Sequence, residues 1–200
     1  MDTKNCILLL GPSGIGKTTV MKNIQKMGDI LSAVSLDNIT HYHARELGLI
    51  SHRDDLNRLL EIFEHDRERF FTFGTEALDK HLTALDDKPV LIDIGTGFLD
   101  APSSLRWIQQ YLSIALMADG AMSFDRFRKY RNIDITYEQY MTTQFCVNRL
   151  KAYNQATIII RTDLIDEATT VRQVFLSIAG LSDESVGRSL LSQWLVPSIS

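Results

Sequence analysis

The sequence contains few cysteines and prolines, no long hydrophobic run and no excess of basic charge. Its 200 residues include two cysteines and four prolines, which excludes a disulfide scaffold and a collagen-like chain. No apolar run approaches the roughly 20 residues of a membrane-spanning helix. Lys and Arg number 21 against 25 Asp and Glu, for a formal net charge of −4, so the basic footprint of nucleic-acid-binding proteins is missing. We therefore expect a cytoplasmic protein whose partners are neither nucleic acids nor membranes.

Short apolar runs recur along the chain. Those at residues 7–10, 90–94, 111–117 and 157–160 are almost wholly apolar, and residues 30–36 form a mixed run. Continuous apolar runs are typical of parallel strands that are buried on both faces.

Longer segments with helical periodicity separate these runs, at residues 54–63, 70–85 and 137–152. Alternating strands and helices predict an α/β fold, a three-layer α/β/α single domain over residues 1–200 with a parallel sheet of about five strands. Residues 118–136 differ, because they are rich in Gly, Arg and Asp and weakly periodic. We expect this segment to be an irregular surface excursion that serves as a lid.

A glycine-rich motif follows the first apolar run. Residues 11–18 read Gly-Pro-Ser-Gly-Ile-Gly-Lys-Thr, a full match to G-x-x-x-x-G-K-[ST], and a helical pattern begins directly after it. In a strand–loop–helix context this motif binds nucleotide phosphates through backbone N–H groups and the helix N-terminus. The predicted nucleotide-binding residues are Gly11, Ser13, Gly14, Ile15, Gly16, Lys17, Thr18 and Thr19.

The motif also predicts the cofactors, ATP and Mg²⁺. Lys17 would reach the β- and γ-phosphates and Thr18 would hold Mg²⁺. Asp93 ends an apolar strand, which suggests a second Mg²⁺ ligand, since a buried carboxylate needs a cation or donors; the alternative is an Asp bonded to backbone or to Thr18. The guanine-binding tetrapeptide N-K-x-D is absent, which favours ATP. The small size favours a small-molecule or nucleoside monophosphate kinase.

Six further segments follow the phosphate loop in an ordered series along the chain. They are Ser35-Leu36-Asp37 after the second strand, Thr72-Phe73-Gly74-Thr75-Glu76 for F-R-x-x-E, Gly95-Thr96-Gly97 for G-G-G, Arg131 for the lid arginine, Arg149-Leu150-Lys151-Ala152-Tyr153 for R-x-P-L-Y, and Thr162-Asp163 after the last strand. The chain resembles a shikimate kinase in the order and approximate spacing of these segments over nearly its whole length.

The resemblance implies roles for these residues. Asp37 would orient or deprotonate the acceptor hydroxyl; the alternative for an Asp at this place is a helix N-cap. Gly95, Thr96 and Gly97 would bind the substrate, or form an ordinary turn. Arg149 would bind a substrate carboxylate with its planar fork, or lie on a helix surface.

The lid arginine has three candidates. Arg131 would act as a catalytic residue that closes over the phosphates, and Arg126 and Arg128 lie in the same segment. The alternative for all three is a solvated basic helix end.

The departures from the family pattern lie on the substrate side. Phe73 stands where the family has a substrate-binding arginine, Thr96 replaces the middle glycine, and Ser35 replaces the first of two aspartates. The arginines that could replace the missing cation are Arg53, Arg58, Arg67 and Arg69.

Together these observations predict an ATP-dependent kinase that transfers the γ-phosphoryl group to a hydroxyl of a small molecule. By resemblance the first acceptor is shikimate, followed by a related polyol or hydroxy acid. A nucleoside monophosphate kinase, and a nucleotide-binding regulatory protein that phosphorylates no acceptor, remain alternatives. We expect a monomer or a homodimer.

Overall fold

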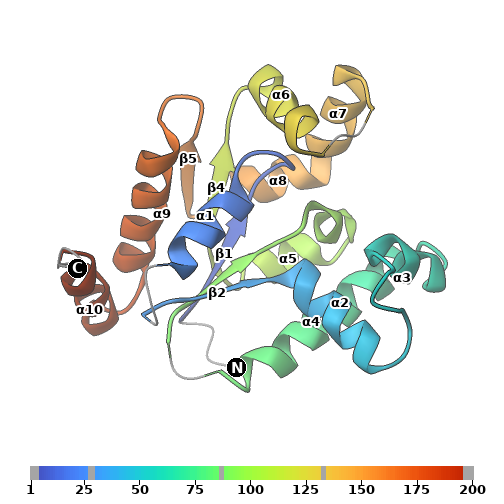
Figure 1. Cartoon of the computed structure of the whole chain (residues 1–200), viewed down its shortest axis with the longest axis horizontal. Helices are drawn as coiled ribbons and strands as arrows, with labels where there is room; N and C mark the ends of the chain where they lie inside the picture. The colour runs from blue at the N-terminus through green and yellow to red at the C-terminus, as the bar shows by residue number, and fades with distance from the viewer. Residues whose placement is uncertain (1–4, 27–29, 86–87, 132–133, 196–200) are drawn as a thin grey trace.

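The computed structural model describes residues 5–26, 30–85, 88–131 and 134–195 and contains one sheet (Figure 1). Its strands are β1 (Cys6–Leu10), β2 (Ser32–Ser35), β3 (Val90–Asp93), β4 (Leu112–Met117) and β5 (Ile158–Arg161). All four pairings are parallel and the strand order is β2-β3-β1-β4-β5. The predicted parallel sheet of about five strands is confirmed.

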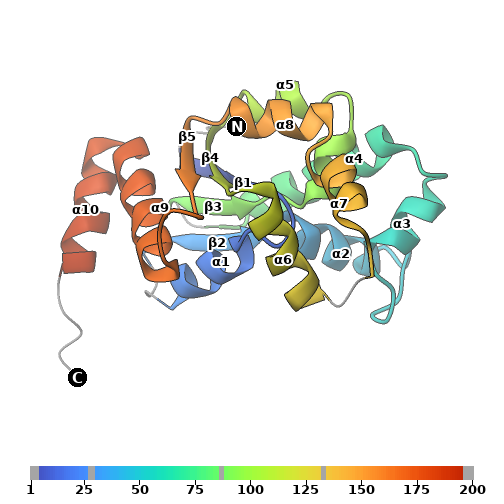
Figure 2. The ribbon, with the colours of Figure 1, turned by 90° about the horizontal axis from the view of Figure 1, so that it is seen from above.

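Helices cover both faces of this sheet (Figure 2). Ile7 and Leu9 of β1 belong to one core, with α1 (Lys17–Gln25), α9 (Glu167–Leu181) and α10 (Glu184–Leu195). Leu8 and Leu10 belong to the other, with α4 (Arg67–Leu82), α5 (Ser104–Ile108) and α8 (Val147–Asn154). Successive side chains of a strand point to opposite faces, so the apolar run of β1 supplies both cores. The predicted three-layer arrangement is confirmed.

Three helices near the β2 side of the molecule carry side chains toward the site described below. They are α2 (Leu36–Glu46), α3 (Leu56–Ile62) and α4. Each begins at a side-chain cap, Ser35 for α2, Asp55 for α3 and Asp66 for α4. An oxygen at this position satisfies N–H groups that have no partner within the helix.

The segment 118–136 is helical rather than irregular over α6 (Gly120–Arg131). Phe124 and Phe127, three residues apart, pack against Tyr140 of α7 (Tyr137–Gln144) in a small separate core. Two apolar residues at this spacing suffice to bury one side of a helix, although they give a weak periodic signal. Its role as a lid stays a prediction.

The helix expected over residues 137–152 is divided in two. It breaks at Cys146, whose backbone is extended, with φ −61° and ψ 162°, between α7 and α8. Tyr140 is buried in the core under α6, whereas Tyr153 is buried against the sheet. The break lets each half bury its own face.

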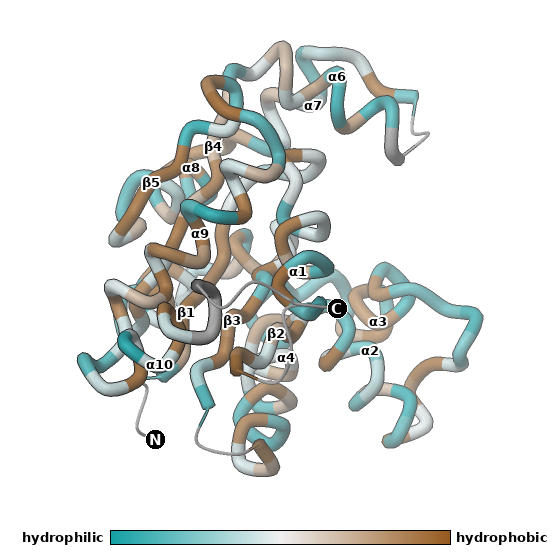
Figure 3. Tube along the Cα trace, turned by 60° about the vertical axis from the view of Figure 1, so that its left-hand side comes forward, coloured by the Kyte–Doolittle hydropathy of each residue, from teal (hydrophilic) through white to brown (hydrophobic). Residues whose placement is uncertain are grey.

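Hydrophobic residues follow the strands β1 and β3, and polar residues dominate around α3 (Figure 3). No helix in the described part of the chain combines the length and apolar character needed to cross a membrane.

Candidate active site

The loop between β1 and α1 adopts a conformation that only glycines tolerate well. Gly11, Gly14 and Gly16 have φ of 141°, 88° and 112°, in the region that L side chains rarely enter. A Cβ on Gly11 would lie 2.5 Å from the carbonyl oxygen of Leu116 in β4. Gly16 precedes α1 and provides no side-chain cap, which leaves the first N–H groups of the helix available to an anion.

Lys17 lies across this loop. Its Nζ donates to the carbonyl oxygen of Gly11 at 2.8 Å and is 4.0 Å from Oδ1 of Asp93. Asp93 is brought there by register, because β3 pairs with β1 and Asp93 lies opposite Leu9. The end of β3 therefore brings a carboxylate beside Lys17, the first residue of α1.

One cavity of about 810 Å³ collects most of the predicted site residues. Its walls come from the phosphate loop, from α1, from the start of α2 and from the end of β3. Its lining includes the predicted residues Ser13, Gly14, Gly16, Lys17, Thr18, Asp37, Asp93, Gly95, Thr96 and Gly97. Of the other predicted nucleotide-binding residues, Gly11 and Ile15 are buried in the loop and Thr19 lines a neighbouring pocket.

Asp37 lies in the first turn of α2, close to the end of β3. The cap of this helix is Ser35, whose hydroxyl accepts the N–H of Asn38 at 3.4 Å, so Asp37 is not the N-cap. A Cβ built on Gly95 would lie 2.1 Å from Oδ1 of Asp37. The absence of a side chain at Gly95 is what lets this carboxylate occupy its place.

A second cavity, of about 560 Å³, adjoins the first at Asp37, Asn38 and Gly97. Its remaining lining residues are His41, Asp54, Asp55, Leu56, Asn57, Leu60, Arg67 and Phe70. We call this space the acceptor cavity and the larger one the phosphate cavity. Asp37 stands at their junction.

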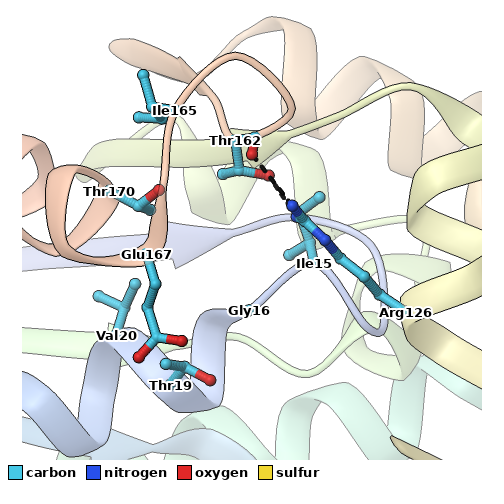
Figure 4. Close-up of a pocket in the computed structure, with 9 residues that line it drawn as sticks. All are labelled: Ile15, Gly16, Thr19, Val20, Arg126, Thr162, Ile165, Glu167 and Thr170. Carbon is cyan, nitrogen blue, oxygen red and sulfur yellow. Dashed lines mark hydrogen bonds between the residues drawn. The ribbon is translucent and has the colours of Figure 1, made fainter. Parts of the chain in front are cut away.

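A third pocket, of about 160 Å³, lies beside the start of α1 (Figure 4). Gly16 and Thr19 form one wall, and Ile165 contributes from the segment after β5. Arg126 of α6 donates to the hydroxyl and to the carbonyl oxygen of Thr162 at 3.0 and 3.2 Å (Figure 4). This arginine therefore ties the predicted lid to the end of β5.

Arg149 is not brought to either large cavity. It is buried and forms a bidentate pair with Asp100, with N–O distances of 2.8 and 2.8 Å. Burial by itself lowers the pKa of Arg149, but the hydrogen bonds and charge of Asp100 outweigh it and raise that pKa. The side chain of Arg131 lies outside the described residues.

Phe73 also lies away from the acceptor cavity. Its ring stacks on His43 at 5.2 Å between centroids and meets the edge of Phe63 at 5.4 Å. Arg67, on an earlier turn of the same helix, lines the cavity instead. Of the four arginines considered as replacement cations, Arg67 is thus the one found there, among the residues that the structure describes.

Two residues of α7 that sequence reasoning missed hold the phosphate loop. The N–H of Ser13 donates to Oε1 of Gln144 at 2.9 Å, and the hydroxyl of Tyr140 donates to the carbonyl oxygen of Ser13 at 2.9 Å. Burial raises the pKa of Tyr140 to about 12, so the hydroxyl stays a donor. More than 120 residues separate the partners in the chain. A local sequence pattern therefore does not predict such a contact.

The predicted Mg²⁺ ligands Thr18 and Asp93 have the chemistry that this ion requires, and their role stays a prediction. Among the described residues, no three His, Cys, Asp or Glu side chains form a metal-binding group. Mg²⁺ commonly uses one or two protein oxygens together with substrate phosphates and water. Thr18 and Asp93 both line the phosphate cavity and offer oxygens of that kind.

These features define a P-loop kinase fold, and the solved structures identify the variant. A shikimate kinase from Acinetobacter baumannii in complex with shikimate matches with a TM-score of 0.63 and 19% identity, over 90% of this chain and 95% of that one. A shikimate kinase from Aquifex aeolicus matches with a TM-score of 0.60 and 19% identity, over 88% and 96%. The chain has a shikimate-kinase-like fold.

The same fold is found in a protein of a different name. A tunicamycin resistance protein from Deinococcus radiodurans matches with a TM-score of 0.57 and 14% identity, over 88% of this chain and 94% of that one. No family model and no curated protein sequence matches the chain. Since one fold hosts several functions, the fold by itself does not define what this protein acts on.

Proposed function

We propose that this protein transfers the γ-phosphoryl group of ATP to a hydroxyl group of a small molecule. The observation that carries the proposal is the meeting of two cavities at Asp37. One cavity is lined by the phosphate loop and the other by polar side chains of α2, α3 and α4. A donor phosphate and an acceptor hydroxyl need this adjacency for in-line transfer.

The nucleotide side of the proposal rests on the loop and on Lys17. Backbone N–H groups at the start of α1 and the Lys17 ammonium would hold the phosphates, with the base in the pocket beneath Arg126. Thr18 and Asp93 would hold Mg²⁺. The bound ion would supply positive charge to the phosphate oxygens, and the rest of catalysis would be positioning and charge stabilisation.

In this proposal Asp37 is the group that orients the acceptor hydroxyl. Its carboxylate faces the point where the cavities join, held against the backbone of Gly95. From there it would accept a hydrogen bond from the acceptor hydroxyl and take its proton as the phosphoryl group leaves ADP.

The test is the release of ADP from MgATP by the purified full chain, with and without added alcohols. Lys17→Ala should lower acceptor-dependent ADP release by about 10²- to 10³-fold, because it removes a preorganised charge from the transferring group. Circular dichroism would check that the variant remains folded.

The matched control is Lys26→Ala, which removes an exposed lysine next to the end of the same helix. It should leave turnover within about twofold of wild type, as surface substitutions usually have small effects. Unchanged turnover in Lys17→Ala would contradict the assignment of the phosphate site.

The acceptor panel separates the proposal from its alternatives. The panel contains shikimate, the first acceptor that the resemblance implies, together with other polyols and hydroxy acids. Stimulation by nucleoside monophosphates alone would identify a nucleoside monophosphate kinase. Nucleotide binding without any acceptor dependence would identify a regulatory protein.

A further inference from the structure

The arginine that the resemblance assigns to an acceptor carboxylate already holds a carboxylate of the chain itself. Both oxygens of Asp100 accept hydrogen bonds from Arg149, at 2.8 Å each. The side chains are 10% and 23% exposed, so little water competes with this pair. A bidentate pair uses the planar fork with which arginine recognises carboxylates. A substrate carboxylate would have to displace Asp100 to use it.

Asp100 also offsets the charge of the arginine that does line the acceptor cavity. Oδ2 of Asp100 is 4.0 Å from Nη1 of Arg67, whose side chain is 43% exposed. Arg58 and Arg69, two further candidate cations, are engaged elsewhere: Arg58 pairs with Glu61 at 2.8 Å and Arg69 lies over the ring of Phe63. Asp100 thus serves as a counter-charge for both Arg149 and Arg67.

Carboxylates outnumber arginines in the wall of the acceptor cavity. Asp37, Asp54 and Asp55 line it, together with Arg67. Hydrogen bonds from the backbone N–H and the hydroxyl of Ser51 lower the pKa of Asp54, which keeps this side chain ionised at neutral pH. These like charges would repel an anionic acceptor, and among the described residues that line the cavity Arg67 is the one arginine that offsets the repulsion.

The same wall offers uncharged hydrogen-bonding groups. Asn38 and Asn57 carry amides, each with donors and an acceptor. His41 Nε2 donates to the carbonyl oxygen of Asp54 at 2.7 Å, so its second ring nitrogen is left as an acceptor or, when protonated, a donor. Such groups suit hydroxyl and amine functions.

We propose that the acceptor is a polyhydroxylated molecule without an acidic group, neutral or amine-bearing, and that Asp100 excludes carboxylate-bearing alcohols. The inference rests on the proposed function and names its substrate class. Discrimination of this kind uses repulsion of the wrong ligand as much as attraction of the right one. It predicts that shikimate, which carries a carboxylate, is not an acceptor of the wild-type protein.

The first test compares probes that differ in one charged group. ADP release by the wild-type chain is measured with glucose, glucosamine and myo-inositol, and with gluconate, glucuronate and shikimate. We expect stimulation of at least about tenfold by one or more of the non-acidic probes and none by the acids. Stimulation by an acidic probe equal to or above that by the non-acidic ones would overturn the proposal.

The second test uses binding and needs no turnover. Asp100→Asn keeps the size of the side chain but removes the counter-charge of Arg149 and Arg67. Calorimetric titration with shikimate should show a Kd at least about tenfold lower than for wild type. Adding Arg67→Gln to this variant should reverse the gain, which a general loosening of the site would not do.

The control is Asp163→Asn, which breaks another bidentate arginine pair, that of Arg161 and Asp163 at the end of β5. It should leave shikimate binding at the wild-type level. Tight binding of shikimate by wild type, or no gain in a folded Asp100→Asn variant, would overturn the inference. If Asp100→Asn does not fold, the wild-type titration and the probe comparison still decide.

The two proposals fail in different ways. Loss of the proposed kinase function would appear as absent nucleotide binding or as turnover that Lys17→Ala leaves unchanged. Loss of the acceptor inference would appear with nucleotide binding intact and with acids binding as well as, or better than, non-acidic alcohols.

Discussion

At the scale of single residues, the contact between Asp37 and Gly95 sets the geometry at the junction of the two cavities. Gly95 has an ordinary backbone conformation, with φ −61° and ψ 138°, which alanine would also adopt. What forbids a side chain there is the carboxylate of Asp37, 2.1 Å from the position of a Cβ. The glycine is needed for space rather than for backbone freedom.

Gly95→Ala should therefore displace Asp37 without unfolding the chain. We expect acceptor-dependent turnover to fall by about 10²-fold, because a displacement of about 1 Å at a reacting centre has effects of this size. ATP affinity, measured by calorimetry, should change by less than about threefold, since the phosphate loop is untouched.

Gly97→Ala is the matched control for this prediction. A Cβ on Gly97 meets no atom within 4 Å, although Gly97 lines the same two cavities. It adds a methyl group to the cavity lining without displacing Asp37, so turnover should fall less in Gly97→Ala than in Gly95→Ala. Equal losses in both variants would show that Asp37 is not the group affected.

At the scale of elements, α7 acts as a support for the phosphate loop. Gln144 and Tyr140 bind both backbone groups of Ser13, and α6 packs so closely that a Cβ on Gly14 would lie 2.8 Å from the backbone of Phe127. A loop rich in glycine is costly to order. These contacts offset part of that cost before the nucleotide arrives.

Tyr140→Phe and Gln144→Ala should each weaken ATP binding about two- to tenfold. A lost hydrogen bond corresponds to about 0.5–1.5 kcal/mol, and here the loss falls on the conformation that binds phosphate. Fluorescence titration with a labelled nucleotide would measure it. Thr142→Ala, an exposed position on the same helix, should have no effect, and equal weakening there would argue against a specific support.

At the scale of the whole molecule, folding stability should depend on acid pH. Asp163 has its pKa lowered to about 2, chiefly by hydrogen bonds from Arg161. The pKa of Asp166 is lowered by hydrogen bonds from Thr169 at the start of α9. In the unfolded chain these carboxyls titrate near the usual value of about 3.9.

A carboxyl group whose pKa is lower in the folded than in the unfolded chain stabilises the fold at pH values above its unfolded-state pKa. This stabilisation is lost as the pH falls through its folded-state pKa. The free energy of unfolding should therefore decrease from about pH 4 toward pH 2. In Asp163→Asn this decrease should be smaller. The free energies of unfolding of wild type and variant, measured by urea denaturation and plotted against pH, should therefore converge at low pH. Parallel curves would show that the pair does not contribute.

Some parts of this protein were predictable from short stretches of sequence. The apolar run of β1 and the motif that follows it predicted a strand, a phosphate loop and a helix in that order, because burial on both faces and phosphate binding leave local signatures. The helix α6 was missed, since among its described side chains Phe124 and Phe127 are the two that belong to a hydrophobic core. The break at Cys146 was missed because two different cores decide it.

The sequence by itself predicted the conformation of the glycine-rich loop between β1 and α1, since that loop is formed by residues that are neighbours in the chain. The tertiary structure alone decided which charged residues stand beside one another around the second cavity. The pairing of Asp100 with Arg149 and the place of Arg67 in the cavity wall join residues from η2 (Thr96–Asp100), α8 and α4. The effect of a charged residue cannot be read from the sequence, because that effect depends on which counter-charge the fold places beside it.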